Sequence, residues 1–150
     1  MKIETVIEKD LSQLKKIART TIIESVEAPE DLKGSIIADT FAHIEKGILV
    51  ENASYLKCVS GEIVGFILIQ NYWNLSDLFV SYCAQGQGFG KELLDAAITE
   101  CQRCSDKDFV RVNSSKNAVG FYRHLGFESY EPKKPLPDFV VPLVYQFKVS

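Results

Sequence analysis

The stretch Leu75-Ser-Asp-Leu-Phe-Val80, followed by the glycine-rich turn Gln85-Gly-Gln-Gly-Phe-Gly-Lys91, decides the fold. Residues 88–104 then show apolar side chains at helical spacing, and residues 109–113 predict a second strand. A strand-helix-strand crossover is nearly always right-handed and makes its two strands parallel. The carboxyl ends of both strands and the amino end of the helix therefore point the same way, toward the edge where open sheets bind ligands.

The other elements follow from hydrophobic periodicity and turn residues. Asp10 is a candidate N-cap with Gln13 three residues on, and Pro29 suits the first turn of a second helix that stops at Gly47. The short glycine-containing turn Ser60-Gly61 separates the runs 55–59 and 62–69 and predicts an antiparallel hairpin. The predicted strands cover residues 2–7, 55–59, 62–69, 75–80, 109–113, 127–130 and 139–149, and a last helix covers residues 116–125. This order predicts a mixed α/β (α+β) fold, with residues 1–150 forming a single domain.

The composition is that of an ordinary globular chain. Its 150 residues suit one domain, and a net charge of −3 does not provide the clustered cations that nonspecific nucleic-acid binding requires. The amino-terminal residues lack an apolar run of signal-peptide length, and no later stretch reaches the roughly 18 apolar residues of a membrane span. We therefore expect a cytoplasmic protein with no nucleic-acid or membrane partner, while a homodimer stays open.

The four cysteines are expected to be reduced thiols. A domain of this size builds a core unaided, and no export signal implies an oxidising compartment. Cys101 and Cys104 form a C-x-x-C pair, but both fall within a predicted helix and no second ligand pair exists. The sequence therefore predicts no bound metal.

The glycine turn is the first candidate for chemistry. Glycine has no Cβ atom, so several backbone N–H groups can converge on an anion at the helix amino terminus. The alternative is a flexible strand-to-helix turn without a ligand. A dinucleotide fingerprint is disfavoured because its last glycine would fall on Lys91 or Leu93. A nucleoside-triphosphate loop is disfavoured because Glu92 stands where it needs Ser or Thr.

The segments Leu78-Phe-Val80 and Gln85-Gly-Gln-Gly-Phe-Gly90 resemble the acetyl-CoA motif of the GCN5-related N-acetyltransferase (GNAT) superfamily, a strand of the type L-F-V before [Q/R]-x-x-G-x-[G/A]. Tyr82 and Ala84 depart from it, where proline and an aromatic residue are frequent. The resemblance implies a mixed, mostly antiparallel sheet with one parallel crossover, flanked by about four helices. It also implies that backbone groups of Phe79 and Val80 face the pantetheine and thioester. The CoA pyrophosphate would be held by the amides of Gln85, Gly86, Gln87, Gly88, Phe89, Gly90 and Lys91.

A second family segment lies downstream. The run Asn117-Ala-Val-Gly-Phe-Tyr122-Arg-His-Leu-Gly126-Phe127 resembles the family's N-A-x-x-F-Y-x-x-x-G-F pattern. The resemblance implies that Asn117 hydrogen-bonds the pantetheine arm and that Tyr122 lies near the sulfur, where we assign it as the general acid for the CoA thiolate. Without the family, Gly126 is a helix stop, Tyr122 a half-buried aromatic and the other apolar side chains core residues.

Asp77 is the second catalytic candidate, because strand alternation puts it on the same face as Phe79 near the expected cofactor. The alternative is a solvated carboxylate at a strand edge. His43 and His124 lie on predicted helices, where a solvated or partly packed histidine is commoner, so neither enters the catalytic set. Three aromatic residues are candidates for an acceptor pocket, with core packing or turn anchoring as the alternative: Phe41, Tyr72 and Trp73.

The resemblance implies transfer of an acetyl group from acetyl-CoA to a primary amine by direct attack within a ternary complex. An alkylamine with a pKa of about 10.4 is mostly protonated at neutral pH, so a base or water chain must remove a proton. The sequence identifies neither the base nor the acceptor, which is open between a small amine, a polyamine, an amino acid and a protein N-terminus. A noncatalytic acyl-CoA-sensing module and an interaction protein without cofactor are the alternatives.

Overall fold

A computed structural model describes residues 1–147 and shows one mixed sheet. Its strand order is β1-β2-β3-β4-β5-β7-β6, and within the described residues the pair β4 and β5 is parallel while the other neighbours are antiparallel. The strands are β1 Lys2–Thr5, β2 Ala53–Ser60, β3 Glu62–Gln70, β4 Asn74–Val80, β5 Phe109–Ser115, β6 Glu128–Ser129 and β7 Val140–Gln146. The predicted fold class is confirmed, and residues 148–149 of the predicted last strand lie outside the described residues.

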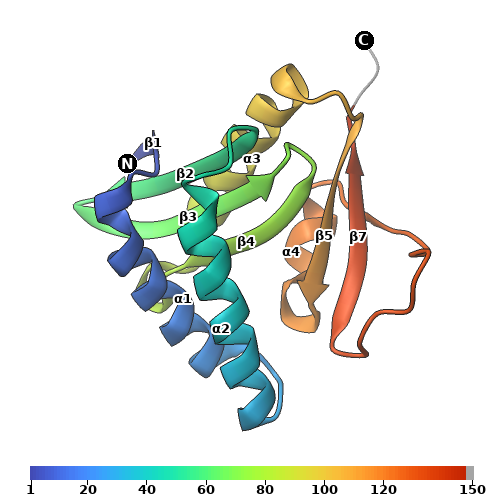
Figure 1. The fold of residues 1–150 in the computed structure, drawn as a ribbon, viewed down its shortest axis with the longest axis horizontal. Coiled ribbons are helices and arrows are strands. Elements are labelled where there is room, and N and C mark those ends of the chain that lie inside the picture. Colours follow the sequence, from blue (N-terminus) through green and yellow to red (C-terminus); the bar gives the residue numbers. More distant parts are fainter. Residues whose placement is uncertain (148–150) are drawn as a thin grey trace.

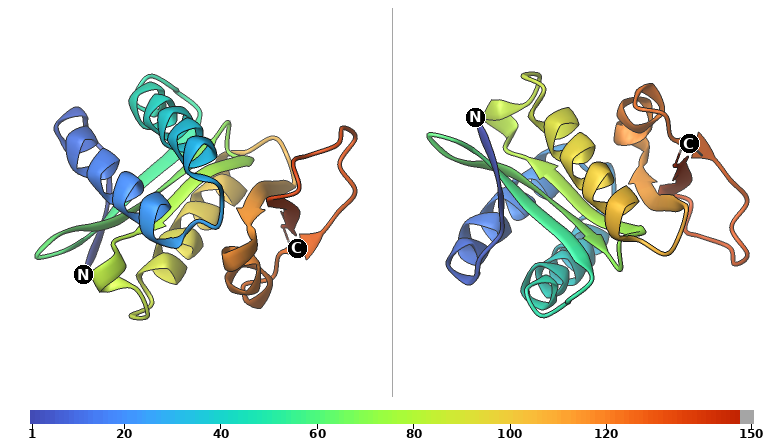
Figure 2. Two further views of the ribbon diagram at one scale, coloured as in Figure 1. Left: turned by 90° about the horizontal axis from the view of Figure 1, so that it is seen from below. Right: turned by 90° about the horizontal axis from the view of Figure 1, so that it is seen from above.

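Helices cover both faces of the sheet, as Figures 1 and 2 show. On one face lie α1 (Leu11–Ser25) and α2 (Glu30–Gly47), and on the other lie α3 (Phe89–Cys104) and the short α4 (Val119–His124). Successive side chains of a strand point to opposite faces, so β3 supplies both cores. Phe66 and Leu68 pack under α1 and α2, whereas Ile67 and Ile69 pack under α3.

At two helix ends, the residue named from the sequence has a different role from the predicted one. Asp10 does not cap α1, because it lies in a preceding 3-10 turn and its carboxylate reaches back to the Ile7 amide (2.9 Å) and to Lys57 (2.6 Å). Burial alone would raise the pKa of Asp10, but the hydrogen bonds from Lys57 and Ile7 outweigh it and lower that pKa. Gly47 ends α2 as predicted, yet what requires glycine there is space, since a Cβ would lie 2.7 Å from the Tyr55 ring.

Two irregularities of β4 position the site. Against β3, Leu75 pairs with Ile69 and Asp77 pairs with Leu68, so Ser76 is an extra residue and forms a β-bulge. The bulge leaves Leu75 in the core under α3 and turns Asp77 toward α2. On its other side, β4 pairs with β5 at its first two residues alone within the described chain, and the strands then separate (Figure 1).

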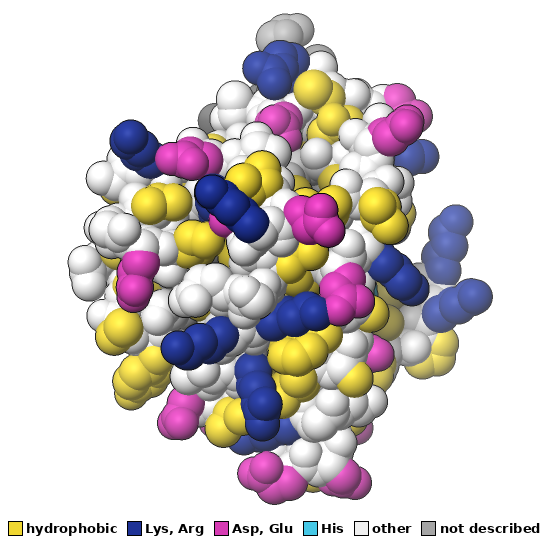
Figure 3. Space-filling view, turned by 60° about the vertical axis from the view of Figure 1, so that its left-hand side comes forward, with side chains coloured by type: hydrophobic (Ala, Val, Ile, Leu, Met, Phe, Trp, Pro, Cys, Tyr) yellow, Lys and Arg dark blue, Asp and Glu magenta, His cyan; other side chains and the backbone are white. Residues whose placement is uncertain are grey.

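The helices of the described residues and the face drawn in Figure 3 bear on membrane and nucleic-acid binding. Among residues 1–147, no helix is both long enough and apolar enough to span a bilayer. On the face in Figure 3, Lys and Arg side chains are interspersed with Asp and Glu side chains. This face therefore offers a phosphate backbone no continuous basic surface.

Candidate active site at the splayed strands

A cavity of about 520 Å³ opens where β4 and β5 separate. We call it the outer cavity. Its walls come from the end of β4, the glycine turn, the start of α3, α4 and one residue of α1. The lining residues are Thr21, Leu78, Phe79, Val80, Ala84, Gln85, Gly86, Gly88, Phe89, Gly90, Lys91, Ala118, Phe121 and Tyr122.

The glycine turn presents backbone amides to this cavity. Gly86 and Gly88 have φ angles of 81° and 86°, a left-handed conformation that favours glycine, and a Cβ on either would meet no atom within 4 Å. Glu92 donates the first helical hydrogen bond of α3, to the Gly88 carbonyl, so the amides before it have no acceptor within the helix. Such amides and the helix dipole together suit an anion, which fits the predicted pyrophosphate cradle.

The Gln85 side chain holds the turn against β4. Its amide donates to the Val80 carbonyl at 3.1 Å, at the point where the strand ends. Gln85 therefore contributes to the site by fixing the backbone of the turn. Gln87 lies in the same turn but does not line the outer cavity.

Tyr122 is fixed by the way α4 ends. Phe127 donates its amide to the Tyr122 carbonyl at 3.0 Å, and Gly126 (φ 102°) donates to the Arg123 carbonyl at 3.1 Å. This pair of bonds is a Schellman motif, and the Tyr122 and Phe127 rings make its usual apolar contact at 5.2 Å between centroids. Gly126 is thus the predicted helix stop.

The Tyr122 ring is buried, and its phenol titrates accordingly. Burial raises the pKa of Tyr122 well above its usual value, and the negative charge of Asp77 raises it further. Tyr122 is therefore a neutral proton donor throughout the ordinary pH range.

A second, smaller cavity of about 240 Å³ adjoins the first. We call it the inner cavity; it reaches from β4 to α1, α2, β5 and β7. It shares Leu78, Phe79, Ala118 and Tyr122 with the outer cavity. The two cavities therefore meet at Tyr122, and Asp77 lies in the wall of the inner one.

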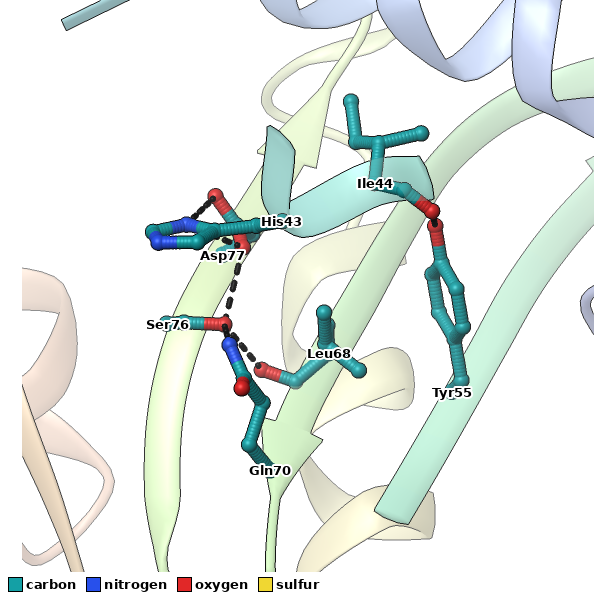
Figure 4. A network of polar contacts seen from close by, with 7 residues as sticks. All are labelled: His43, Ile44, Tyr55, Leu68, Gln70, Ser76 and Asp77. Carbon is teal, nitrogen blue, oxygen red and sulfur yellow. Dashed lines mark hydrogen bonds and ion pairs between the residues drawn. The ribbon is translucent and has the colours of Figure 1, made fainter. Parts of the chain in front are cut away.

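Asp77 is held in a polar network between β3, β4 and α2 (Figure 4). Ser76 Oγ donates to the Asp77 carboxylate at 2.8 Å and accepts from Gln70 Nε2 at 3.0 Å. His43 Nδ1 lies 3.2 Å from Asp77 Oδ2 and 3.5 Å from Oδ1. The Asp77 side chain is buried, so the alternative of a solvated strand-edge carboxylate is wrong.

His43 belongs to this network although sequence reasoning left it out. The hydrogen bond with Asp77 raises the pKa of His43 above its usual value, and burial opposes this only in part. Its side chain is 41% exposed, so the imidazole connects a buried carboxylate to solvent. The position of His43 depends on how α2 seats on the sheet, where the Tyr55 hydroxyl donates to the Ile44 carbonyl at 2.9 Å (Figure 4). No local sequence signal reports that contact.

Thr21 is the second residue that the sequence did not reveal. It lines the outer cavity from α1, and its Oγ1 is buried without a hydrogen-bond partner among residues 1–147. A buried hydroxyl without a partner is costly. Thr21 Oγ1 is thus suited to bond a ligand in the cavity.

Asn117 is the residue that the resemblance assigns to the pantetheine arm. It does not line the outer cavity, and its side-chain amide donates to the Ser25 carbonyl at the end of α1. The short 3-10 turn of Lys116–Ala118 sets this direction. In this structure Asn117 therefore links the start of α4 to α1.

The aromatic residues proposed for an acceptor pocket are dispersed. Tyr72 and Trp73 lie at the β3–β4 turn, away from both cavities, where Trp73 packs edge-on against Phe109. Phe41 belongs to α2, is partly buried and packs against the core that α1 and α2 cover. His124 is exposed, as expected for a solvated helix residue. None of these side chains lines either cavity in the described residues.

Known proteins share both the sequence pattern and the fold. A family model described as an acetyltransferase (GNAT) domain matches residues 18–135. The chain belongs to the GNAT family. A GCN5-related N-acetyltransferase from Rhodopseudomonas palustris has a TM-score of 0.80 at 15% identity, over 97% of this chain and 95% of that chain.

Two further GNAT-like structures were solved with their ligands. The PaiA N-acetyltransferase of Thermoplasma acidophilum, in complex with coenzyme A, has a TM-score of 0.77 at 18% identity, over 97% of this chain and 98% of that one. YncA of Salmonella typhimurium, with its cofactor acetyl-CoA, has a TM-score of 0.72 at 16% identity, over 100% and 95%. No curated protein matches this chain. At these identities the likeness concerns the fold, and it confirms the GNAT fold.

Proposed function

We propose that residues 1–150 act as one N-acetyltransferase domain that transfers an acetyl group from acetyl-CoA to a primary amine by direct attack in a ternary complex. The observation that carries the proposal is the meeting of two cavities at Tyr122, one lined by backbone amides and the other holding the buried Asp77 carboxylate. The coenzyme A and acetyl-CoA in the relatives from T. acidophilum and S. typhimurium support the choice of cosubstrate.

The outer cavity takes acetyl-CoA in this proposal. Its volume of about 520 Å³ is that of an ordinary cofactor site. Acetyl-CoA supplies a thioester carbonyl that an amine can attack. The backbone amides of residues 85–91 hold the pyrophosphate, and the free edge of β4 at Phe79 and Val80 lies along the pantetheine and thioester. Thr21 Oγ1 gives a further hydrogen bond from α1.

The inner cavity takes the amine, and its network removes the proton. The ammonium form of the acceptor pairs with Asp77 and gives up one proton there before the nitrogen attacks the carbonyl carbon. His43 is bonded to the same carboxylate and partly exposed, so it passes that proton to solvent. A C–N bond then forms, and the C–S bond breaks as Tyr122 protonates the sulfur. The second proton of the nitrogen, released as the amide forms, restores the Tyr122 hydroxyl, and no covalent enzyme intermediate is formed.

Tyr122 protonates the leaving thiolate. The gap between a thiol pKa of about 8.5 and a tyrosine pKa of about 10 makes this transfer uphill by roughly 2 kcal/mol. Burial raises the pKa of Tyr122, but the same burial raises the pKa of a thiol beside it, so the two shifts act in one direction. The cost stays within what enzymes offset, since they lower barriers by roughly 8–23 kcal/mol.

The test is release of CoA thiol from acetyl-CoA in the presence of amines, with the product identified by the mass of one added acetyl group. A noncatalytic sensing module would bind acetyl-CoA, seen by calorimetry, yet release no thiol with any amine. The unpaired Cys58, Cys83, Cys101 and Cys104 suit a reducing compartment, so we place the reaction in the cytoplasm. Assays should use a reductant that does not react with the thiol reporter.

A further inference from the structure

The residues that line the inner cavity favour one class of acceptor. We propose, resting on the acetyl transfer proposed above, that the acceptor is a compact, mainly apolar primary monoamine of the alkyl or arylalkyl class. A polyamine, an amino acid and a protein N-terminus are then poor acceptors.

Size is the first argument. The inner cavity measures about 240 Å³, which lies below the roughly 300–1,000 Å³ of sites for drug-sized ligands. Where it meets the outer cavity, the wall is formed by the shared residues Leu78, Phe79, Ala118 and Tyr122. A short chain or one ring with a two-carbon tether fits this space, whereas a folded peptide segment does not.

The apolar lining is the second argument. Most of the wall consists of hydrocarbon side chains from α1, α2, β4, β5 and β7 and from the segments next to them. They are Ile22, Val26, Ile36, Leu75, Leu78, Phe79, Val112, Ala118, Phe139 and Val140. Apolar surface that leaves water here favours binding in proportion to the area buried. The body of the acceptor is therefore hydrocarbon.

Charge is the third argument, and it separates amines from amino acids. Within the described residues, the inner-cavity lining has one carboxylate, Asp77, and no Lys or Arg. Asp77 Oδ1 is the less engaged oxygen, with its contact to His43 at 3.5 Å, and is the one left for an ammonium group. The carboxylate of an amino acid would be desolvated near Asp77 with no cation to pair with it.

The presence of one carboxylate in the inner-cavity lining also argues against diamines. A second ammonium group needs a second carboxylate or water, and the other polar lining residues are neutral: Thr40, Ser76, Asn113, Ser114 and Ser115. These groups can hydrogen-bond one hydroxyl on a substrate but do not neutralise a charge. One buried carboxylate therefore selects one ammonium.

The decisive experiment compares matched acceptors at a pH above the raised pKa of His43, where Asp77 keeps its net charge. Phenethylamine against phenylalanine isolates the carboxylate, and pentylamine against 1,5-diaminopentane isolates the second ammonium. A tripeptide with amino-terminal phenylalanine represents protein acceptors. We expect kcat/KM to favour the monoamine by at least 100-fold in the first pair and about tenfold in the second.

A charge variant ties the preference to this cavity. Ile36→Lys places a cation in the inner-cavity wall and should narrow the phenethylamine preference over phenylalanine at least tenfold. Ile37→Lys is the matched control, because Ile37 is its helix neighbour, does not line the cavity and should leave the ratio unchanged. Both positions are partly exposed, so both variants should fold.

The outcomes separate this inference from the proposed function. Faster transfer to phenylalanine, to the diamine or to the tripeptide would uphold acetyl transfer and overturn the monoamine assignment. An unchanged ratio in folded Ile36→Lys would show that the acceptor binds elsewhere and overturn it as well. Acetyl-CoA binding without thiol release for any acceptor would instead refute the proposed function, and the inference with it.

Discussion

The outer and inner cavities share the Tyr122 wall but are built from different parts of the chain. Ten of the 14 residues that line the outer cavity come from one continuous segment, from the end of β4 through the glycine turn into α3, and its candidate anion ligands are backbone amides. The inner cavity is made by side chains from α1, α2, β4, β5 and β7. A backbone site tolerates most side-chain changes and fails when its space is filled. A side-chain site changes its preference with each substitution.

The largest effect expected from this comparison is at the glycine turn. Gly88→Trp should abolish acetyl-CoA binding, because the open space at its Cβ position is where the phosphates would lie. Calorimetric titration measures the loss. Any substitution here also strains the left-handed backbone at φ 86°, so strain needs a control.

Gly61→Trp provides that control. Gly61 has a φ of 77° and equally open space, but it lies in the β2–β3 turn and does not line the outer cavity. Gly61→Trp therefore strains a left-handed backbone to the same degree but adds no side chain to the outer cavity. If both variants fold and bind acetyl-CoA equally well, the phosphate cradle has been assigned to the wrong turn.

The next effect concerns the wall that both cavities share. Tyr122→Phe keeps the ring contact with Phe127 and removes only the hydroxyl. The dissociation constant for acetyl-CoA should hardly change, while kcat falls by about 10²- to 10⁴-fold, the usual range for a lost general acid. Single-turnover kinetics measure the chemical step directly. Tyr145→Phe, which alters another tyrosine that contacts Phe127, should keep the parental rate.

How much of the site could be predicted follows from the same contrast. The glycine turn and Gly126 were legible because a strand end, a turn and a helix end are local events with their own residue preferences. His43 and Thr21 sit on amphipathic helices, where the sequence shows a core-facing stripe but not which residue meets which strand. Their places depend on contacts such as that between Gly47 and Tyr55.

The fold shows the same division. The β2–β3 hairpin and the parallel crossover were predicted, because alternation and turn residues specify them. The bulge at Ser76 was not, since two adjacent polar residues, Ser76 and Asp77, do not by themselves specify a bulge within a strand. That bulge puts Leu75 and Asp77 on opposite faces of the sheet. An irregularity that the sequence did not predict therefore directs the Asp77 carboxylate toward the inner cavity.

A smaller effect is expected at His43, and its sign can be worked out. Asp77 and Asp39 raise the pKa of His43, while burial and Lys46 lower it, and the net shift is upward from 6.5. Protonated His43 neutralises Asp77 and cannot accept a proton from it. Activity should therefore fall as pH drops through this raised pKa. The effect on stability has the opposite sign. The His43–Asp77 interaction contributes its full stabilisation of the fold below pH 6.5, and this stabilisation is lost as the pH rises through the pKa that His43 has in the folded protein.

The measurement is the pH profile of kcat/KM with trifluoroethylamine, whose own ammonium is far more acidic than an alkylammonium. If the fall in kcat/KM at low pH (the acidic limb) persists with this acceptor, a group of the protein and not the acceptor causes it. His43→Gln, which still donates to Asp77 but does not titrate, should remove the limb and lower the plateau about tenfold. A limb unchanged in His43→Gln would assign it to another group and leave Asp77 to work without a relay.

The smallest effect is at Thr21, where two measurements should move in opposite directions. Thr21 Oγ1 is buried without a partner among the described residues, so Thr21→Val removes a destabilising group and should raise the free energy of unfolding by about 1 kcal/mol. If the hydroxyl bonds acetyl-CoA, the same change should weaken binding about fivefold, the value of one ordinary hydrogen bond.

Ser54→Ala is the control that separates the effect of Thr21 on stability from its effect on acetyl-CoA binding. Ser54 Oγ is also buried without a partner in residues 1–147, but it lies on β2 and lines neither cavity. Its removal should raise stability in denaturant unfolding and leave the acetyl-CoA dissociation constant unchanged. Equal affinities for Thr21→Val and the parent would mean that the hydroxyl faces no part of the ligand. The outer cavity would then bind its cofactor through backbone groups alone, which would make the contrast with the inner cavity sharper still.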